Sequence, residues 1–455
     1  MNALPVVVVG AGPVGLAAAA ELTARGLPVL VLERGDRAGA AVAQWRHVRL
    51  FSRWAELIAP AARPLLESRD WQQPDVNGYP TGSEWAARYL GPLAEALGDR
   101  VRFGTEVIGV ARRGRDRVVD AGRDTEPLTV HVRTGNGEER IAARAVIDAS
   151  GTWTTPSPLG GDGLPAIGET AAADRISYRV PDLAAPDTAA RYANKHVVVA
   201  GSGHSALTAL VAFAALADDH PATRITWLLR RGDIGATFGG GQADQLPARG
   251  ALGLRAQSAV EAGRISVVTG FRTETVERDD SGRLILVPAE GDPVTAVDEV
   301  VVLTGFRPDL SWLAEIRLGL DATLQAPTAL APLIDPNVHS CGSVYPHGVK
   351  ELSHPDPDVF LVGMKSYGRA PTFLAMTGYE QVRSIAAALA GDREAAERVE
   401  LVLPETGVCG GSGLFDAPTE ESSGGCCAAP TEVHELSLPA PVAIQDLTLT
   451  ATTSR

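Results

Sequence analysis

Two glycine-rich turns of the same design, each directly after a run of small and aliphatic residues, constrain this chain more than any other feature. The first is Gly10-Ala11-Gly12-Pro13-Val14-Gly15 after Val6–Val9, and the second is Gly201-Ser202-Gly203-His204-Ser205-Ala206 after Val197–Ala200. A buried strand that leads through such a turn into a helix binds one dinucleotide by its pyrophosphate. The two turns therefore predict two dinucleotides and an α/β fold with two Rossmann-like domains.

The residues around the first turn suit that role. Its first glycine permits the tight turn, its second lets the backbone approach a pyrophosphate, and its third lets the next helix pack on the strand. The proline suits the start of a helix, expected over Val14–Arg25, whose positive end faces the phosphates. A second strand, Val29–Leu32, ends in Glu33, which can accept hydrogen bonds from ribose hydroxyls and would repel a 2′-phosphate. This site is expected to hold FAD or NAD.

The residues after the second glycine turn favour a different dinucleotide. After it we expect a helix over Ser205–Leu216 and a strand over Ile225–Leu229, which ends in Arg230-Arg231 instead of an acid. Guanidinium groups make planar, bidentate contacts with phosphates, so this half predicts NADPH, with the arginines on its 2′-phosphate. An arginine that merely faces solvent at a strand end is the alternative. A nicotinamide and a flavin brought together would exchange a hydride.

The net charge and the distribution of apolar residues argue against some classes of binding partner. The net charge of −14 argues against nucleic acid or an anionic membrane surface. No apolar stretch approaches the ~20 residues that span a bilayer. Because Met1–Leu4 enter the first strand without a basic leader, we expect a cytoplasmic protein. A homodimer is compatible with the sequence.

The order of patterns predicts an interrupted layout: a first part of the FAD domain (1–158), an NADPH domain (159–324), a second part of the FAD domain (325–400) and a flexible tail (401–455). The tail has no periodicity and is rich in small and polar residues. Further elements are expected as strands at 101–110, 145–149, 299–303 and 359–362, a β-ribbon at 128–132 and a helix at 372–390.

This succession of motifs resembles the two-dinucleotide-binding flavoproteins, and within them the flavin-containing monooxygenases and their bacterial relatives. The resemblance rests on the two glycine turns, Glu33, Ala149-Ser150-Gly151, Arg230-Arg231 and Thr304-Gly305-x-x-Pro308. It implies FAD at the first site and NADPH at the second. NADPH would reduce the flavin, O₂ would add as a C4a-hydroperoxide, and a soft nucleophile such as nitrogen or sulfur would take one oxygen atom.

The predicted site residues follow from the turns and the resemblance together. Trp45 and Arg46 are the candidates near the reaction, to wall off the flavin ring and to bind an anionic oxygen, although packing and surface charge explain them equally well. The FAD residues would be Gly10, Gly12, Pro13, Gly15, Glu33, Arg34, Trp45, Val107, Ser150, Gly151, Gly363 and Thr372. The NADPH residues would be Gly201, Ser202, Gly203, His204, Ser205, Arg230, Arg231, Thr304 and Gly305.

The chain departs from its relatives at three points. The monooxygenase fingerprint Phe-x-Gly-x-x-x-His is missing ahead of the second turn, which weakens the assignment of reaction type. Gly363-Met364 stands where many related reductases have Gly-Asp, so a backbone N–H would serve the flavin there. No cysteine follows Glu33 in the first part or occurs in the second domain, which argues against a redox-active disulfide beside the flavin.

The tail holds three of the four cysteines, Cys409, Cys426 and Cys427. Thiolates on a flexible segment can gather around a soft ion, and three of them match trivalent arsenic or antimony. Taken whole, the chain resembles the flavoprotein monooxygenases associated with bacterial arsenic resistance, which makes arsenite or an organoarsenical the hypothetical substrate. Incidental cysteines and adventitious zinc or mercury binding are alternatives. Two other functions stay open: a reductase that passes electrons to these thiols, a metal ion or a partner disulfide, and a non-enzymatic redox or metalloid sensor.

Overall fold

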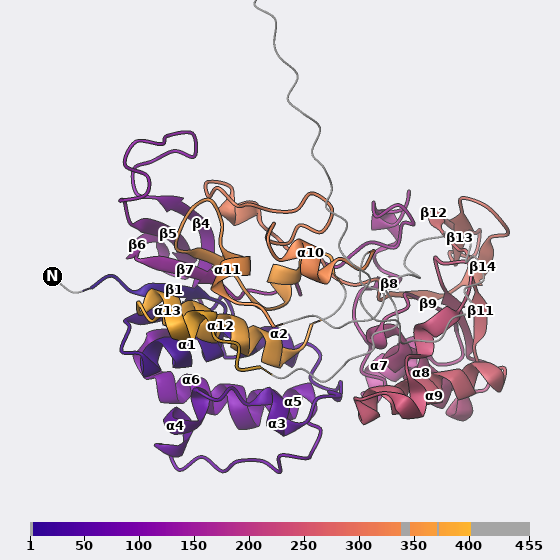
Figure 1. Cartoon of the computed structure of the whole chain (residues 1–455). Helices are drawn as coiled ribbons and strands as arrows, with labels where there is room; N and C mark the ends of the chain where they lie inside the picture. The colour runs from indigo at the N-terminus through magenta and orange to yellow at the C-terminus, as the bar shows by residue number, and fades with distance from the viewer. Residues whose placement is uncertain (1–2, 338–345, 371–372, 402–455) are drawn as a thin grey trace, which may run out of the picture. The chain divides into compact units, whose positions relative to one another are not determined.

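The described residues, 3–337, 346–370 and 373–401, form two parallel sheets of five strands each in a computed structural model of the chain (Figure 1). The first sheet contains β1 (Val6–Val9), β2 (Val29–Leu32), β3 (Val101–Arg102), β7 (Ala145–Asp148) and β16 (Val359–Leu361), in the order β16-β7-β1-β2-β3. The second contains β8 (Ile176–Ser177), β9 (His196–Ala200), β10 (Arg224–Leu228), β11 (Ser266–Val268) and β15 (Glu299–Val302), in the order β11-β10-β9-β15-β8. Since β16 follows the second sheet in sequence but pairs with β7 of the first, one domain interrupts the other. This confirms the predicted fold class.

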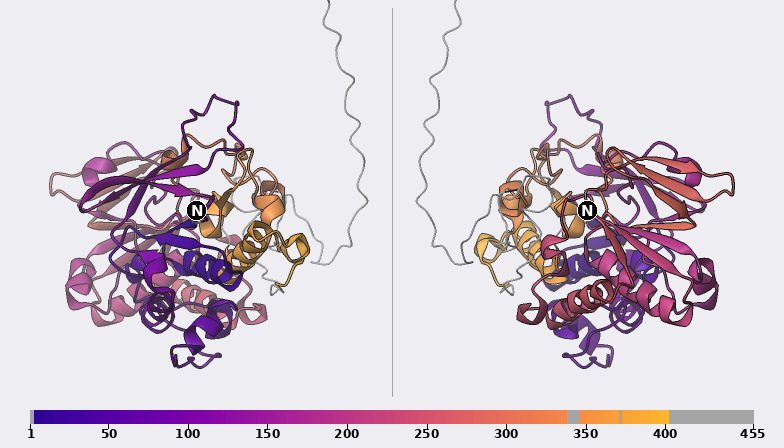
Figure 2. Two further views of the ribbon diagram at one scale, coloured as in Figure 1. Left: turned by 90° about the vertical axis from the view of Figure 1, so that its left-hand side faces the viewer. Right: turned by 90° about the vertical axis from the view of Figure 1, so that its right-hand side faces the viewer.

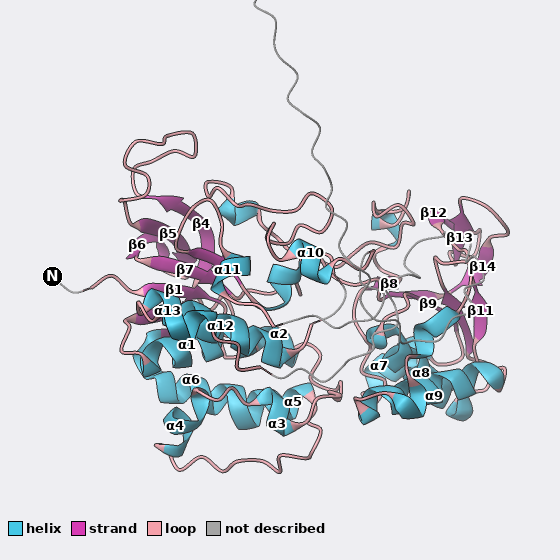
Figure 3. Cartoon of the chain, viewed as in Figure 1, coloured by secondary structure: helices cyan, strands magenta, loops and turns pink. Residues whose placement is uncertain are grey.

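Helices cover one face of the first sheet and antiparallel strands cover the other (Figure 3). The main helices on this face are α1 (Pro13–Ala24) and α12 (Ala375–Leu389), which pack against each other. The strands are β4 (Glu106–Arg112), β5 (Leu128–Thr134) and β6 (Gly137–Ala143). The shorter helices of this domain are α2 (Ala40–Ala43), α3 (Trp54–Leu57), α4 (Ala62–Glu67), α5 (Gly82–Trp85), α6 (Gly91–Leu97), α10 (Ala331–Ile334), α11 (Val349–Leu352) and α13 (Arg393–Glu397).

The run of valines in β1 explains why the sheet is covered on both faces. Side chains alternate along a strand, so Val6 and Val8 pack toward the helices while Val7 and Val9 pack toward β4–β6. Such a strand cannot face water on either side, which is the pattern of a buried parallel sheet.

The second sheet is layered in the same way, as the right-hand view of Figure 2 shows. Its helices are α7 (Pro186–Tyr192), α8 (His204–Asp219) and α9 (Pro247–Glu261), and its antiparallel strands are β12 (Thr273–Arg278), β13 (Leu284–Pro288) and β14 (Val294–Val297). In both domains the glycine turn therefore joins a central strand to a helix that packs on one face of the sheet. Short 3-10 helices lie at 98–100, 170–172, 235–238, 241–243, 311–313 and 363–367, and a π-helical turn lies at 86–90.

Two of the expected elements are corrected by the structure. The single strand expected at 101–110 is wrong, because Gly104 turns the chain at φ +61° between β3 and β4, which belong to different sheets. The expected ribbon at 128–132 is a longer hairpin, β5–β6, that pairs with β4. The last long helix begins at Ala375, and residues 371–372 lie outside the described part.

The chain crosses to the second domain and returns through two segments that pair with each other. Ser157 donates its N–H to the carbonyl of Gly305 (2.9 Å), and Arg307 donates its N–H to the carbonyl of Thr155 (2.8 Å). Beyond the return, Leu313 and Ile316 pack in the core between the first sheet and β4–β6. The domain boundaries stay predictions, and all but the first residue of the expected tail lies outside the described residues.

Candidate functional site: two glycine cradles and an aromatic pocket

The first glycine turn has the shape that a bound pyrophosphate needs. Gly10 has φ +99°, and a Cβ there would lie 2.9 Å from the carbonyl oxygen of Ala149. A Cβ on Gly15 would lie 1.9 Å from the carbonyl oxygen of Gly10, so α1 can pack here only without a side chain. At Gly12 a Cβ would meet nothing within 4 Å, which leaves open space at the start of α1, where Pro13 stands. The turn therefore fits the FAD pyrophosphate.

Glu33 is fixed at the end of β2 by the backbone around the turn. Its Oε2 accepts the N–H of Ala11 and its Oε1 accepts the N–H of Gly35, both at 2.7 Å. Each carboxylate oxygen has a further lone pair, so the group can still accept bonds from ribose hydroxyls. The neighbouring Arg34 lies 3.8 Å from Glu106 at the start of β4, the strand that also carries the half-buried Val107. Thus the structure brings Glu33, Arg34 and β4 together.

The second turn repeats this geometry. Gly201 has φ +128°, and a Cβ there would lie 2.3 Å from the carbonyl oxygen of Leu303, whereas Gly203 has nothing within 4 Å. Ser205, exposed in the first turn of α8, borders the same open side. The hydroxyl of Thr304 points away from this open side, since it donates to the carbonyls of Ser157 and Pro158. Gly305, at φ +101°, belongs to the paired crossing segments.

The strand register gives the second site no counterpart of Glu33. Gly10 donates to the carbonyl of Leu32 and Gly201 donates to the carbonyl of Leu228, so the residue in the place of Glu33 is Leu229, which is buried. A leucine cannot bind ribose hydroxyls and does not repel a 2′-phosphate. The register therefore removes the acid that favours an unphosphorylated ribose.

The two arginines that follow Leu229 lie differently. Arg231 reaches back to the turn, where its Nη2 donates to the hydroxyl of Ser202 at 3.2 Å. Arg230 is exposed, and its Nη1 donates to the carbonyl of Gly161 at 3.3 Å. Burial lowers the pKa of His204 to about 4, with the charge of Arg249 acting in the same direction. A neutral His204 offers no positive charge to a phosphate at pH 7.

A buried ion pair lies beside the first glycine turn, and the sequence analysis did not predict it. The Nζ of Lys365 lies 2.6 Å from Oδ2 of Asp148 and donates to the hydroxyl of Ser150 at 3.0 Å. Oδ1 of Asp148 in turn accepts the N–H and hydroxyl of Ser150, and Gly151 follows at φ +70°. The available signal was an aspartate within the apolar run of β7, because buried charges are almost always paired.

Two further predicted FAD residues have different outcomes. Gly363 has φ +67°, but its N–H donates to Oε1 of Gln381 at 2.7 Å, so the backbone donor expected for the flavin is engaged by α12. Thr372 lies outside the described residues.

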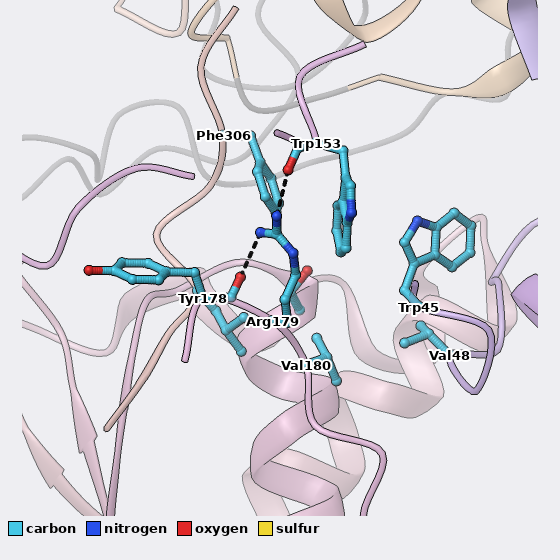
Figure 4. A pocket seen from close by; sticks show the side chains of 9 residues that line it. Trp45, Val48, Trp153, Tyr178, Arg179, Val180 and Phe306 are labelled. Carbon is cyan, nitrogen blue, oxygen red and sulfur yellow. Dashed lines mark hydrogen bonds between the residues drawn. The ribbon is translucent and has the colours of Figure 1, made fainter. Parts of the chain in front are cut away.

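A pocket with about 570 Å³ of empty space, part of it continuous with solvent, lies next to the second turn (Figure 4). Its walls are mostly aromatic and aliphatic: Trp45, Val48, Trp153, Tyr178, Arg179, Val180, Ser205, Leu303 and Phe306. Trp45 comes from the segment after α2, and the neighbouring Gln44 accepts a bond from the indole N–H of Trp153 at 2.8 Å. Of the two predicted reaction-site residues, only Trp45 lines the pocket. Arg46 is exposed and lies 4.0 Å from Asp182.

The only basic side chain in this lining belongs to Arg179, and sequence reasoning missed it. Its guanidinium packs over Trp153, 4.0 Å from the ring centre, and over Phe306 at 5.2 Å. It donates to the backbone carbonyls of Trp153 (2.7 Å) and Tyr178 (3.1 Å). Burial lowers the pKa of this guanidinium, which nevertheless stays charged at any physiological pH.

Metal ligands and cysteines do not contribute to the described site. Within residues 3–337, 346–370 and 373–401 no group of three or more histidines, cysteines or acids could hold a metal ion. The predicted metalloid ligands Cys409, Cys426 and Cys427, together with Cys341, lie outside this part of the chain. No helix in it is long and apolar enough to cross a membrane.

Residues 7–331 match the model of the pyridine nucleotide-disulphide oxidoreductase family. The chain therefore belongs to this family and is an FAD-containing oxidoreductase that works with a pyridine nucleotide, in agreement with the expected cofactors.

The relatives of known function include a monooxygenase and ferredoxin–NADP reductases. The chain is 37% identical over 152 residues to the indole-3-pyruvate monooxygenase YUCCA1 of Oryza sativa subsp. japonica, a match that covers 33% of this chain and 32% of that relative. It is 29% identical over 324 residues to a ferredoxin–NADP reductase of Ralstonia nicotianae, which covers 70% of this chain and 74% of the reductase. The chain thus spans about a third of the first relative and most of the second.

Solved structures of the same fold also include a reductase and a monooxygenase. The bacillithiol disulfide reductase of Bacillus cereus superposes with a TM-score of 0.63 and 19% identity, over 85% of this chain and 99% of that one. The cadaverine monooxygenase DfoA of Erwinia amylovora, bound to FAD, superposes with a TM-score of 0.61 and 14% identity, over 92% of this chain and 100% of that one. At these identities the likeness concerns the fold.

Proposed function

We propose that this protein is an NADPH-dependent flavin monooxygenase that oxidises a small molecule held in the aromatic pocket. The observation that carries the proposal is the pocket itself, which is bordered by Trp45 and by Ser205 at the second glycine turn. Its mostly aromatic and aliphatic walls suit a small organic molecule. The similarity to a plant indole-3-pyruvate monooxygenase supports the same reaction class.

The chain would contribute binding, orientation and exclusion of water. When bound, FAD takes up a hydride from the nicotinamide and in its reduced form reacts with O₂. Gly12 and Gly203 leave room for the two pyrophosphates, and Arg231 would bind the 2′-phosphate of NADPH. Trp45 and Trp153 would keep water from the reacting atoms, which is the main requirement for oxygen transfer rather than oxygen reduction.

The ferredoxin–NADP reductases among the relatives favour a second candidate, a reductase that delivers electrons to an acceptor without oxygen. The two reactions separate under anaerobic conditions. We expect NADPH to reduce the flavin rapidly without O₂, and a single turnover with O₂ to reoxidise it while a bound substrate gains an oxygen atom. Steady anaerobic turnover with ferredoxin or a disulfide, and no oxygenated product in air, would identify the reductase.

A second candidate substrate, which competes with an organic molecule bound in the aromatic pocket, is a trivalent arsenical, because the three tail thiols suit an ion that prefers three sulfur ligands. The variant with Cys409, Cys426 and Cys427 all changed to Ser should show a raised KM for the arsenical and unchanged oxidation of NADPH by O₂. Unaltered turnover of the arsenical in that variant would remove the tail from the mechanism and leave the pocket as the determinant of the substrate.

A further inference from the structure

The guanidinium of Arg179 has spare hydrogen-bonding capacity in the pocket. A guanidinium carries five N–H donors, and within the described part of the chain the guanidinium of Arg179 donates only to the two backbone carbonyls of Trp153 and Tyr178. No carboxylate of the described residues forms an ion pair with it. A half-buried cation without a counter-charge is costly, and a bound anion would offset that cost.

The position of this cation is fixed by its neighbours. Trp153 and Phe306 lie with ring centres 5.0 Å apart, and the guanidinium rests over both. The preceding residue, Tyr178, donates its hydroxyl to the buried carboxylate of Glu169 at 2.5 Å. That carboxylate also accepts the backbone N–H groups of Leu159 and Ala166. Arg179 is thus held ready for a ligand rather than free to turn into solvent.

The rest of the pocket calls for a flat apolar body. Trp45, Val48, Val180 and Leu303 add aromatic and aliphatic surface around the guanidinium. Figure 4 shows Trp153 between Arg179 and Trp45, with the valines below them. Aromatic rings stack favourably on such walls, while a carboxylate makes paired, charge-assisted hydrogen bonds with a guanidinium.

We propose that the pocket binds an aromatic monocarboxylate, with its carboxylate on Arg179 and its ring among Trp45 and Trp153. This inference deepens the proposed function, on which it rests, by naming the chemical class of the small-molecule substrate. The nicotinamide ring itself carries no negative charge for Arg179, and the pyrophosphate of NADPH is assigned to the second turn, where Gly203 leaves room for it. An aromatic acid supplies a carboxylate for Arg179 and a flat apolar ring for the walls in one molecule.

The test compares two probes of the same shape, indole-3-carboxylate and the neutral indole-3-carboxamide, by calorimetric titration of the full chain loaded with FAD. We expect the acid to bind at least about tenfold more tightly, as a charge-assisted contact provides. Arg179→Gln should abolish the difference. The matched control is Arg307→Gln, because Arg307 bonds to the carbonyl of Gly163 and does not line the pocket. It should preserve the difference.

Equal binding of the two probes by the wild-type chain would overturn the inference, even if Arg179→Gln fails to fold. The rate of flavin reduction by NADPH is the second readout. It should be unchanged in the control Arg307→Gln, and a slowed reduction in an Arg179→Gln chain that still prefers the acid would assign the pocket to the nicotinamide instead. Binding is measured without NADPH, so a chain that binds the acid through Arg179 but never oxygenates it fails the proposed function alone.

Discussion

Lys365 and Asp148 form an ion pair of 2.6 Å in which the lysine side chain is 1% exposed and the aspartate is fully buried. The lysine follows β16 and the aspartate ends β7, so the pair joins two neighbouring strands at the edge where Gly10 turns. The lysine also lies 4.8 Å from the centre of the Trp312 ring. A charge in such a place depends on its partner, because water cannot reach it.

Replacing only the lysine should therefore be strongly destabilising. Lys365→Met leaves the Asp148 carboxylate buried without a counter-charge, and we expect the free energy of unfolding to fall by about 3–5 kcal/mol. Urea unfolding of the purified chain measures this loss. The double variant Lys365→Met, Asp148→Asn should recover a large part of it. Equal losses in the single and double variants would show that the ion pair is not the cause.

The glycine turns allow the two cofactors to be removed separately. Gly12→Ala and Gly203→Ala place a methyl group where the protein itself has nothing within 4 Å, so both variants should fold. Because the methyl groups occupy the space for a pyrophosphate, the first should be colourless after addition of FAD. The second should be yellow but not bleached by NADPH.

Absorbance measures FAD binding and bleaching by NADPH in these variants, and circular dichroism measures whether they fold. Gly15→Ala is the contrasting case, since its methyl group would lie 1.9 Å from a backbone oxygen and should destabilise the fold itself. A Gly12→Ala chain that binds FAD as tightly as the wild type would argue against this turn as the flavin site.

Coenzyme choice should depend on the arginines after Leu229. Arg231→Ala removes the guanidinium that bonds to Ser202 in the second turn. We expect the KM for NADPH to rise about tenfold or more, with little change for NADH, because only NADPH carries the phosphate. Arg230→Ala tests the exposed neighbour in the same way. Arg255→Ala, an exposed arginine on α9, is the control. A parallel loss for both coenzymes would point to the fold rather than to the 2′-phosphate.

His204 should make the protein less stable in mild acid. Burial lowers its pKa to about 4 in the folded chain, whereas an unfolded histidine has a pKa of roughly 6.5. Between these values the unfolded state binds more protons, so the free energy of unfolding decreases as the pH falls through this window. His204→Gln should flatten that part of the profile, measured by urea unfolding at several pH values. His220→Gln, at the other end of α8, should not. An unchanged slope in His204→Gln would contradict the assignment.

Local sequence patterns predicted the fold well because each motif is complete within a few neighbouring residues. A strand, a turn with Gly10 or Gly201 and a helix form one continuous segment, and the apolar run of β1 indicates burial on both faces. The same reasoning failed at Gly104, where one glycine divides the expected strand between two sheets. The nature of a residue shows that a turn is possible, and tertiary packing decides whether it occurs.

The contacts that the sequence could not predict join distant segments. Asp148 stands out in an apolar run, but its partner Lys365 is identified only once two strands become neighbours. Likewise, Leu229 matches Glu33 only once the register of the second sheet is known. Arg179 likewise becomes a site residue only because Trp153 and Phe306 come together beneath it. Such pairs carry no spacing signal along the chain.

The paired crossing segments at Ser157–Gly305 and Thr155–Arg307 have a consequence for how such an enzyme can be built. A domain whose two ends leave its host side by side can be cut out, and the open ends can be rejoined by a short loop without disturbing the host sheet. The interrupted architecture is therefore modular. We therefore expect that the second domain could be exchanged as one unit between flavoproteins of this layout while the flavin-binding part retains its own core.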